Sequence, residues 1–202
     1  MNRLLVATRS AGKQAEFRSL LAQLPVTIVF PADLDLAESA EENGLETHAT
    51  FEANARAKAR WFARRSGLPT LADDSGLEVD ALNGAPGVHS KRFAGGDGPD
   101  ALVASANNAQ LLERLRDVPE AARTARYRCV LVLARTGGDE IVVSGATDGR
   151  IARAPRGSGG FGYDPLFFSD ELGMTFGEAT DEAKHAVSHR GRAVAALARV
   201  WV

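Results

Sequence analysis

Cysteine is almost absent from this chain of 202 residues, and it has no long apolar run. Cys129 is the single cysteine, so no disulfide can form within the chain and a reducing compartment is expected. No stretch approaches the roughly 18 apolar residues of a membrane-spanning helix. The apolar run near the start is too short for the core of a signal peptide. We therefore expect a cytoplasmic protein with no membrane partner.

An excess of positive charge is also lacking. The chain has 24 Lys and Arg against 26 Asp and Glu, which gives a formal net charge of −2 and a pI of about 6.1. This composition lacks the basic footprint of a general nucleic-acid binder, so no nucleic-acid partner is expected. An anionic ligand must instead meet a locally positive site. The length suits one domain over residues 1–202, or one domain with a small lobe.

The order of hydrophobic patterns predicts a mixture of strands and helices. An apolar run at 4–7 precedes helical spacing over 11–24, so the chain is expected to open as strand, turn and helix. Further strands are expected at 26–30, 70–72, 77–82, 125–134 and 140–147. Further helices are expected at 50–65, 100–116, 178–187 and 190–201. This mixture predicts an α/β protein with a mixed sheet.

The first turn, from Thr8 to Lys13, lies where a strand leads into a helix. Unpaired N–H groups and the helix dipole favour an anion there, and the ammonium of Lys13 suits phosphate. The turn is not a Walker A loop, because position 7 is alanine and Gln14 follows the lysine. The alternative is an ordinary helix cap at Ser10 with an exposed lysine.

Two adjacent carboxylates occur in Asp73-Asp74-Ser75-Gly76, which we expect at the end of a strand. Successive side chains on an extended backbone point to opposite faces, so one aspartate should face a ligand while the other braces the loop. A carboxylate in this place could bind Mg²⁺ or polarise an attacking water. The alternative is an Asx turn. The polar loop 31–47 could supply a further carboxylate from Glu38, Glu41 or Glu42, although a solvated loop is the simpler interpretation.

A glycine-rich segment at 157–165 matches the pattern G-x-G-x-x-G. We reject a dinucleotide-binding interpretation, because Pro165 and a β-like stretch follow in place of a helix. The segment is then a flexible loop that carries Phe161 and Tyr163. An aromatic ring on such a loop can stack on a base, and the alternative is that these rings fill the core.

Lys184 and His189 are five residues apart and Arg190 follows directly, so two cations could converge at a helix junction near the end of the chain. An arginine can donate two hydrogen bonds to the keto oxygen and ring nitrogen of a purine. His185 and His189 are four residues apart, but a zinc site would need a third ligand that the sequence does not reveal. The alternative for the cluster is a basic helix end favoured by the dipole.

Taken together and in this order, four segments resemble the RdgB-like inosine/xanthosine triphosphate pyrophosphatase family. They are VATRSAGKQAEF, ADDSGLEVDALNGAPGVHSKRFAG, GSGGFGYDPLFF and KHAVSHRGRA, which together cover nearly the whole chain. The resemblance implies an elongated mixed β-sheet flanked by helices that form two lobes with a central substrate cleft, usually in a homodimer. It also implies Mg²⁺-dependent hydrolysis of ITP, dITP and XTP to the monophosphate and pyrophosphate, which removes deaminated purines from the nucleotide pool.

The resemblance further implies roles for individual residues. Asp74 would be the catalytic base and would hold Mg²⁺ together with Glu42. Lys184, His189 and Arg190 would read the base. The full set of implied substrate contacts is Thr8, Arg9, Ser10, Ala11, Gly12, Lys13, Ser75, Phe161, Gly162, Tyr163, Asp164, Lys184, His189 and Arg190.

Three positions in two segments depart from the family pattern. The phosphate turn usually reads Thr-Gly-Asn, whereas this chain has Arg9 and Ser10, so an extra charge enters the turn and a contact through water could replace that of the asparagine. Position 53 often carries an acid and is alanine here, and neighbouring Glu52 could substitute for it.

Two other functions remain open. One is a Maf-like pyrophosphatase acting on modified pyrimidine or 7-methylguanine nucleotides, and the other is a nucleotide-binding protein without turnover.

Donors such as Lys184 or Arg190 would pair with a 6-oxo purine and be left unpaired by adenine. The same reasoning does not explain how guanine would be rejected.

Overall fold

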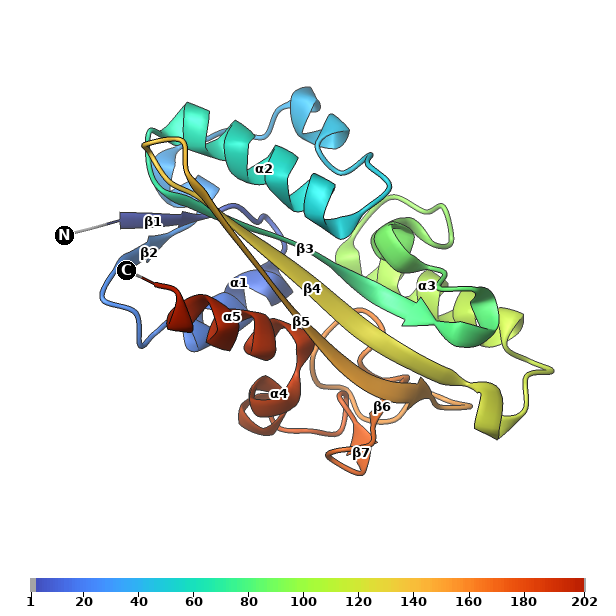
Figure 1. The fold of residues 1–202 in the computed structure, drawn as a ribbon. Helices are drawn as coiled ribbons and strands as arrows, with labels where there is room; N and C mark the ends of the chain where they lie inside the picture. The colour runs from blue at the N-terminus through green and yellow to red at the C-terminus, as the bar shows by residue number, and fades with distance from the viewer. Residues whose placement is uncertain (1–2, 202) are drawn as a thin grey trace. The chain divides into compact units, whose positions relative to one another are not determined.

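The computed structural model describes residues 3–201, and its strands form one mixed sheet in the order β2-β1-β3-β4-β5-β6-β7 (Figure 1). The strands are β1 Arg3–Val6, β2 Thr27–Val29, β3 Thr70–Val79, β4 Thr124–Ala134, β5 Glu140–Ile151, β6 Phe167–Ser169 and β7 Met174–Thr175. The α-helices are α1 Ala11–Leu20, α2 Phe51–Ser66, α3 Asp100–Arg114, α4 Asp181–Val187 and α5 His189–Arg199. Strand β1 is parallel to β2 and β3, whereas β5, β6 and β7 are antiparallel, so the expected mixed α/β sheet is confirmed.

The described residues fall into two compact units. The first unit takes in the chain up to Asp74, Cys129–Gly145 and the segment from Arg190 onward, and the second takes in Ser75–Arg128 and Ala146–His189. Strands β3, β4 and β5 each contribute residues to both units. Within residues 3–201, no helix combines the length and apolar character that crossing a membrane requires.

In the first unit, helices cover both faces of the sheet, because alternate residues of β1 enter different cores. Leu4 and Val6 pack in a cluster with Phe17 of α1 and Leu197 of α5. Leu5, which lies between them in β1, packs in a second cluster with Ala55, Ala59, Trp61 and Phe62 of α2. Figure 1 shows the same arrangement, with α2 on one side of the strands and α1 and α5 on the other.

The second unit has its own core, in which α3 packs with residues from β3, β4, β5 and β6. Arg123 is buried beside this core and donates to the carbonyl oxygens of Ile151, Leu115 and Ala152 at 2.8, 2.6 and 3.1 Å. These bonds fix the end of α3 to the end of β5. They also give these carbonyl oxygens hydrogen-bond donors, and a buried carbonyl group without a donor would destabilise the fold.

The expectation that the paired aspartates lie at a strand end is wrong for their own strand, because β3 runs without interruption from Thr70 to Val79. The strand that ends here is its neighbour. The register pairs Val6, the last residue of β1, with Leu71, so β3 continues past the aspartates beyond the end of β1. The loop 31–47 also contains two short 3₁₀ helices, Pro31–Leu34 and Ala40–Gly44.

Candidate functional site

The turn from Thr8 to Lys13 connects β1 to α1 in the first unit, as expected. Ser10 occupies the N-cap position but its side chain makes no capping bond. The side-chain Nε2 of Gln14 donates to the carbonyl oxygen of Thr8 at 3.1 Å. Ala11 and Gly12 form the first turn of α1. The ammonium of Lys13 lies 3.0 Å from Asp73 Oδ2, and its side chain is only 18% exposed. The exposed lysine of the alternative interpretation is therefore wrong.

Asp73 is the centre of a buried ion-pair network in the first unit. Besides Lys13, its Oδ2 accepts from Arg190 Nη2 at 3.2 Å, and the same guanidinium binds Glu16 through Nη1. Burial alone would raise the pKa of Asp73, but the charges of Lys13, Arg190 and Lys58 hold it well below its usual range. Asp73 is therefore a stable anion that ties α1 and α5 to β3.

Asp74 has a different environment, although it is also buried. Asn54 Nδ2 of α2 donates to its Oδ2 at 2.8 Å. Its pKa is raised, first because burial disfavours the charged form and also because Glu46 carries a like charge nearby, while Lys13 and Lys58 act in the opposite direction. The negative charge of Asp74 is thus incompletely compensated, so a proton or a cation would relieve it.

The acidic loop places the carboxylates of Glu42 and Glu46 in ion pairs of the first unit. Glu42 receives two hydrogen bonds from the guanidinium of Arg9, both at 2.7 Å, so the predicted metal ligand is paired with a predicted substrate residue. Glu46 forms an ion pair with the buried Lys58. The pattern did not single out Glu46, because nothing local distinguishes it from the other acids of the loop. Glu52 instead pairs with Arg56 on the surface of α2, with half of its side chain exposed.

No group of three acidic, His or Cys side chains in residues 3–201 forms a ready-made metal site. Mg²⁺ commonly needs only one or two protein carboxylates, the rest of its shell being water and phosphate oxygens. The donor set around Asp74 fits that requirement, because its carboxylate is undercompensated and Glu46 lies close enough to raise its pKa. The zinc hypothesis gains no third ligand, and its two histidines lie on separate helices, α4 and α5.

The second unit brings several predicted substrate residues together around Asp164. Lys184 Nζ donates to Asp164 Oδ2 at 2.6 Å, and each of the two side chains is only 4% exposed. The amide of Phe161 donates to the same oxygen at 2.8 Å, and the ammonium lies 5.1 Å from the centre of the Phe161 ring. A Cβ atom at Gly160, where φ is +69°, would lie 2.1 Å from Asp164 Oδ2, so this position requires glycine.

Tyr127 belongs to the same cluster, although the sequence pattern did not indicate it. Its ring stacks on His189, with centroids 4.6 Å apart and an angle of 11° between the planes. Its hydroxyl donates to Asp164 Oδ1 at 3.4 Å. In the sequence, Tyr127 looks like one more core residue of β4. Only the fold brings it beside Asp164 and His189, which come much later in the chain.

The other predicted residues of the second unit have plainer surroundings. Tyr163 is a core residue whose hydroxyl donates to the carbonyl oxygen of Ser90 at 2.8 Å, so the packing interpretation holds for this ring. Gly162 has φ +64° and accepts a bond from Asn108. Ser75 follows Asp74 in β3 and is partly exposed.

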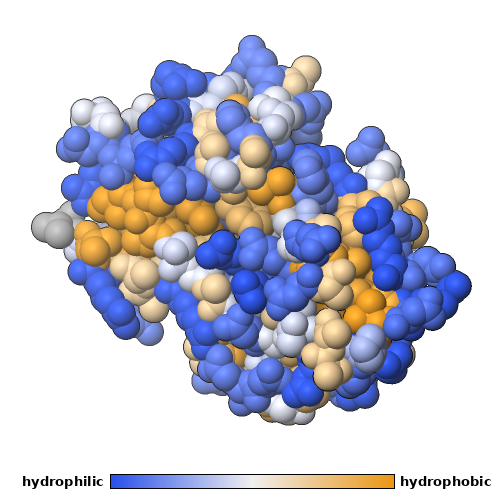
Figure 2. All heavy atoms as spheres, turned by 45° about the vertical axis from the view of Figure 1, so that its right-hand side comes forward, coloured by the Kyte–Doolittle hydropathy of each residue, from blue (hydrophilic) through white to orange (hydrophobic). Residues whose placement is uncertain are grey.

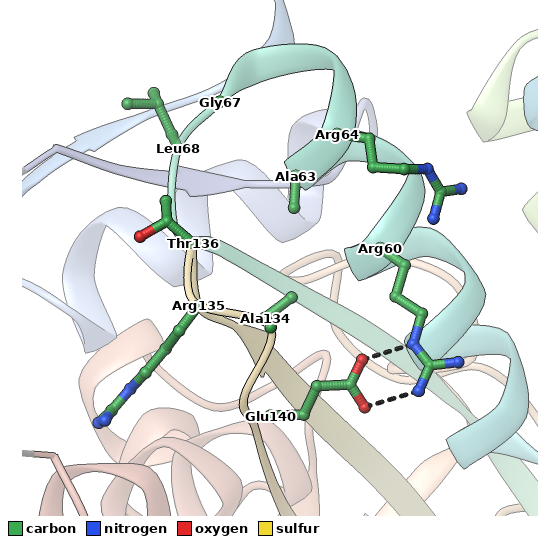
Figure 3. A pocket seen from close by; sticks show the side chains of 10 residues that line it. Arg60, Ala63, Arg64, Gly67, Leu68, Ala134, Arg135, Thr136 and Glu140 are labelled. Atoms are coloured by element: carbon green, nitrogen blue, oxygen red, sulfur yellow. Dashed lines mark hydrogen bonds and ion pairs between the residues drawn. The ribbon is translucent and has the colours of Figure 1, made fainter.

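A pocket of about 520 Å³ lies elsewhere in the first unit, between the end of α2 and the β4–β5 turn. Figure 3 shows Arg60 paired with Glu140 at this pocket, while Arg64 and Arg135 point in different directions. None of the predicted site residues lines it.

Comparison with known proteins gives consistent matches over nearly the whole chain. The model of the Ham1 family matches residues 4–200. A dITP/XTP pyrophosphatase of Geobacter sulfurreducens is 50% identical over 197 residues, covering 98% of this chain and 95% of that protein. One from Shigella flexneri is 48% identical, covering 98% and 96%. The structure of a HAM1 protein from Coxiella burnetii has a TM-score of 0.84 at 37% identity, with 99% and 98% coverage.

Proposed function

Because the chain belongs to the Ham1 family, we propose that it is a Mg²⁺-dependent enzyme that hydrolyses ITP, dITP and XTP to the nucleoside monophosphate and pyrophosphate. The observation that carries this proposal is the contrast between two adjacent buried carboxylates. The charge of Asp73 is compensated by Lys13 and Arg190, which hold its pKa low, whereas burial raises the pKa of Asp74. An undercompensated carboxylate beside a cationic turn suits a reaction of a metal-bound polyphosphate.

The first unit supplies the groups for the triphosphate. Asp74 orients the attacking water and accepts its proton, with Asn54 holding the carboxylate through Oδ2. The turn from Thr8 to Lys13 presents backbone N–H groups and an ammonium to the phosphate oxygens. Mg²⁺, held by Asp74 and Glu42, would neutralise charge on the phosphates and on the departing pyrophosphate.

The second unit supplies groups for the base. Asp164 fixes the ammonium of Lys184, and Tyr127 fixes the ring of His189. Donors held in place pair with the oxygen of a 6-oxo purine and are left unpaired by the amino group of adenine. Discrimination built on unpaired buried donors can reach roughly 10⁴-fold. Arg190 contributes less directly, because its guanidinium binds Glu16 and Asp73.

A substrate panel tests the activity. The protein is incubated with Mg²⁺ and ITP, dITP, XTP, GTP, ATP, dTTP or UTP, and pyrophosphate and orthophosphate are measured separately. We expect pyrophosphate from ITP, dITP and XTP, and little product from ATP. Preference for dTTP or UTP would instead favour the Maf-like alternative. Tight nucleotide binding with no pyrophosphate release would favour a binding protein.

The variant Asp74→Asn tests the role of the carboxylate. The amide keeps the shape and a hydrogen-bond acceptor for Asn54 but cannot accept the proton, so we expect at least about a 10²-fold loss of kcat. The folding transition should be retained. Asp97→Asn, which changes an exposed aspartate of the second unit, is the control and should keep full activity. Near-normal turnover by Asp74→Asn would refute the assignment.

We also propose a cytoplasmic location, which the single cysteine favours, and a homodimer, which the resemblance implies. The face shown in Figure 2 is largely polar but carries apolar patches, which is the kind of surface that association covers. Sedimentation equilibrium would decide the oligomeric state, and a concentration-independent monomer would contradict the dimer.

A further inference from the structure

Arg9 and Glu42 are joined by an ion pair whose two members were expected to bind ligands of opposite charge. Arg9 Nε donates to Glu42 Oε2 and Nη2 donates to Oε1, both at 2.7 Å. The resemblance implies that Arg9 contacts the anionic substrate and that Glu42 contacts the metal. In the structure both carboxylate oxygens of Glu42 face a guanidinium, so a cation at Glu42 and Arg9 compete for the same atoms.

The neighbouring groups stabilise the ion pair between Arg9 and Glu42 but leave both side chains partly exposed. Arg9 Nη2 also donates to the carbonyl oxygen of Leu36 at 2.9 Å, and the guanidinium lies 5.9 Å from the ring centre of Phe62. Glu42 Oε1 accepts from the amide of Ser39 at 3.2 Å. The side chain of Arg9 is 28% exposed and that of Glu42 is 13% exposed. Arg9 can therefore leave for solvent or a ligand, while Glu42 remains positioned by its own backbone contact.

We propose that Arg9 and Glu42 form an exchangeable pair that couples metal binding to nucleotide binding. Without ligand, Arg9 neutralises Glu42 and weakens its affinity for a divalent cation. When the metal–triphosphate complex binds, Arg9 leaves Glu42 for the phosphate oxygens, and the carboxylate of Glu42 becomes available to the cation. This inference rests on the proposed function and gives Arg9 two roles, as the mask of Glu42 without ligand and as a phosphate contact with it.

The exchange has a thermodynamic signature, because coupling between two ligands is reciprocal. The protein should bind a bare divalent cation weakly and bind it more tightly once a triphosphate has attracted Arg9. Removing the charge of Arg9 should therefore move two constants in opposite directions. Affinity for the bare cation should rise, whereas affinity for the nucleotide should fall.

The test measures Mn²⁺ binding by electron paramagnetic resonance, without nucleotide, in the full chain. Arg9→Gln should tighten Mn²⁺ binding about fivefold, the scale of a well-formed, partly exposed Arg–carboxylate pair. The same variant should raise the KM for ITP about fivefold at saturating Mg²⁺. Arg60→Gln is the matched control, because it removes a two-pronged pair with Glu140 in the same unit and should change neither constant. Thermal unfolding verifies that each variant is folded.

A double-variant cycle separates the pair from a general charge effect. In a Glu42→Gln background, Arg9→Gln should no longer tighten Mn²⁺ binding, because the carboxylate that it masks is gone. Persistence of the fivefold gain in that background, or unchanged Mn²⁺ binding in Arg9→Gln alone, would overturn the inference. Those failures are distinct from failure of the proposed function, which would appear as wild-type protein that releases no pyrophosphate from ITP.

Discussion

The buried pair between Lys184 and Asp164 gives the sharpest prediction about the second unit. Both side chains are 4% exposed, and their N–O distance is 2.6 Å. In Lys184→Met the carboxylate of Asp164 loses its cation but keeps the hydrogen bond from the amide of Phe161. In Asp164→Asn the ammonium loses its anion and must remain buried against a neutral amide. Each change therefore leaves one charge inside the unit.

The expected magnitude follows from that burial. Breaking a buried pair by removing one partner costs about 3–5 kcal/mol, and we take the lower end because each variant keeps a polar neighbour. A loss of about 3 kcal/mol corresponds to a fall in Tm of roughly 6–12 °C for a chain of this size. The double variant Asp164→Asn/Lys184→Met removes both charges and should recover to within about 1 kcal/mol of wild type.

Thermal and urea unfolding of the four proteins would check this cycle, with coincident probes to establish whether the transition is two-state. The single variants should each unfold well below the wild type, and the double variant should unfold above either one. Single losses below about 1 kcal/mol, or losses that simply add in the double variant, would show that the pair is not the buried, mutually dependent unit described above.

Two further predictions concern Glu140 and Tyr127. Hydrogen bonds from Arg60, with the charges of Arg60 and Arg56, hold the pKa of Glu140 below its usual value. The ionised Glu140 therefore stabilises the fold above the unfolded pKa of about 4.3, and this stabilisation is lost as the pH falls through the lower folded pKa. Glu140→Gln should accordingly lower the free energy of unfolding by about 1 kcal/mol at pH 7 and by nearly nothing near pH 2, and an equal loss at both pH values in urea titrations would count against this reasoning. Tyr127→Leu should raise the KM for ITP about fivefold with a smaller effect on kcat, because it removes a stack worth about 1 kcal/mol from His189. Tyr127→Phe keeps the stack and should stay within about twofold of wild type. Equal defects of the two variants in steady-state kinetics would assign the effect to the hydroxyl, which both variants lack and which donates to Asp164, and would refute the role of the stack.

Local patterns predicted the parts of the molecule in which near neighbours in the chain decide the structure. The apolar run at 4–7 and the helical spacing after Ser10 placed the strand, the turn and α1 correctly. The α/β class followed from the order of such segments. The same patterns placed Asp73 and Asp74 beside a strand end, and they could not show that the ending strand is β1 rather than β3. Pairing between strands far apart in sequence determines that detail.

The contacts of the candidate site were harder to predict, because they join distant segments. Arg9 meets Glu42 across 33 positions, and Tyr127 meets Asp164 across 37. No local spacing distinguishes Glu42 from the other acids of its loop, nor Tyr127 from the other apolar residues of β4. The resemblance to a family indicated which residues matter, and it left open what each one contacts in the absence of ligand.

The contrast between Asp73 and Asp74 nevertheless has an origin in the simplest rule of strand geometry. Because both lie inside β3, their side chains point to opposite faces of the sheet. Asp73 contacts Lys13 of α1 and Arg190 of α5, whereas Asp74 contacts Asn54 of α2, the helix on the other face. One layer of helices therefore supplies cations that stabilise a permanent anion.

The other layer leaves its carboxylate short of positive charge, because the nearby Lys58 is itself paired with Glu46. A one-residue shift in the register of β3 would exchange the two faces of the sheet. It would place the side chain of Asp73 in the surroundings that Asp74 now has. The continuity of β3 through the pair is thus a requirement of the proposed chemistry, since a turn at Asp73 would remove the alternation that separates the two roles.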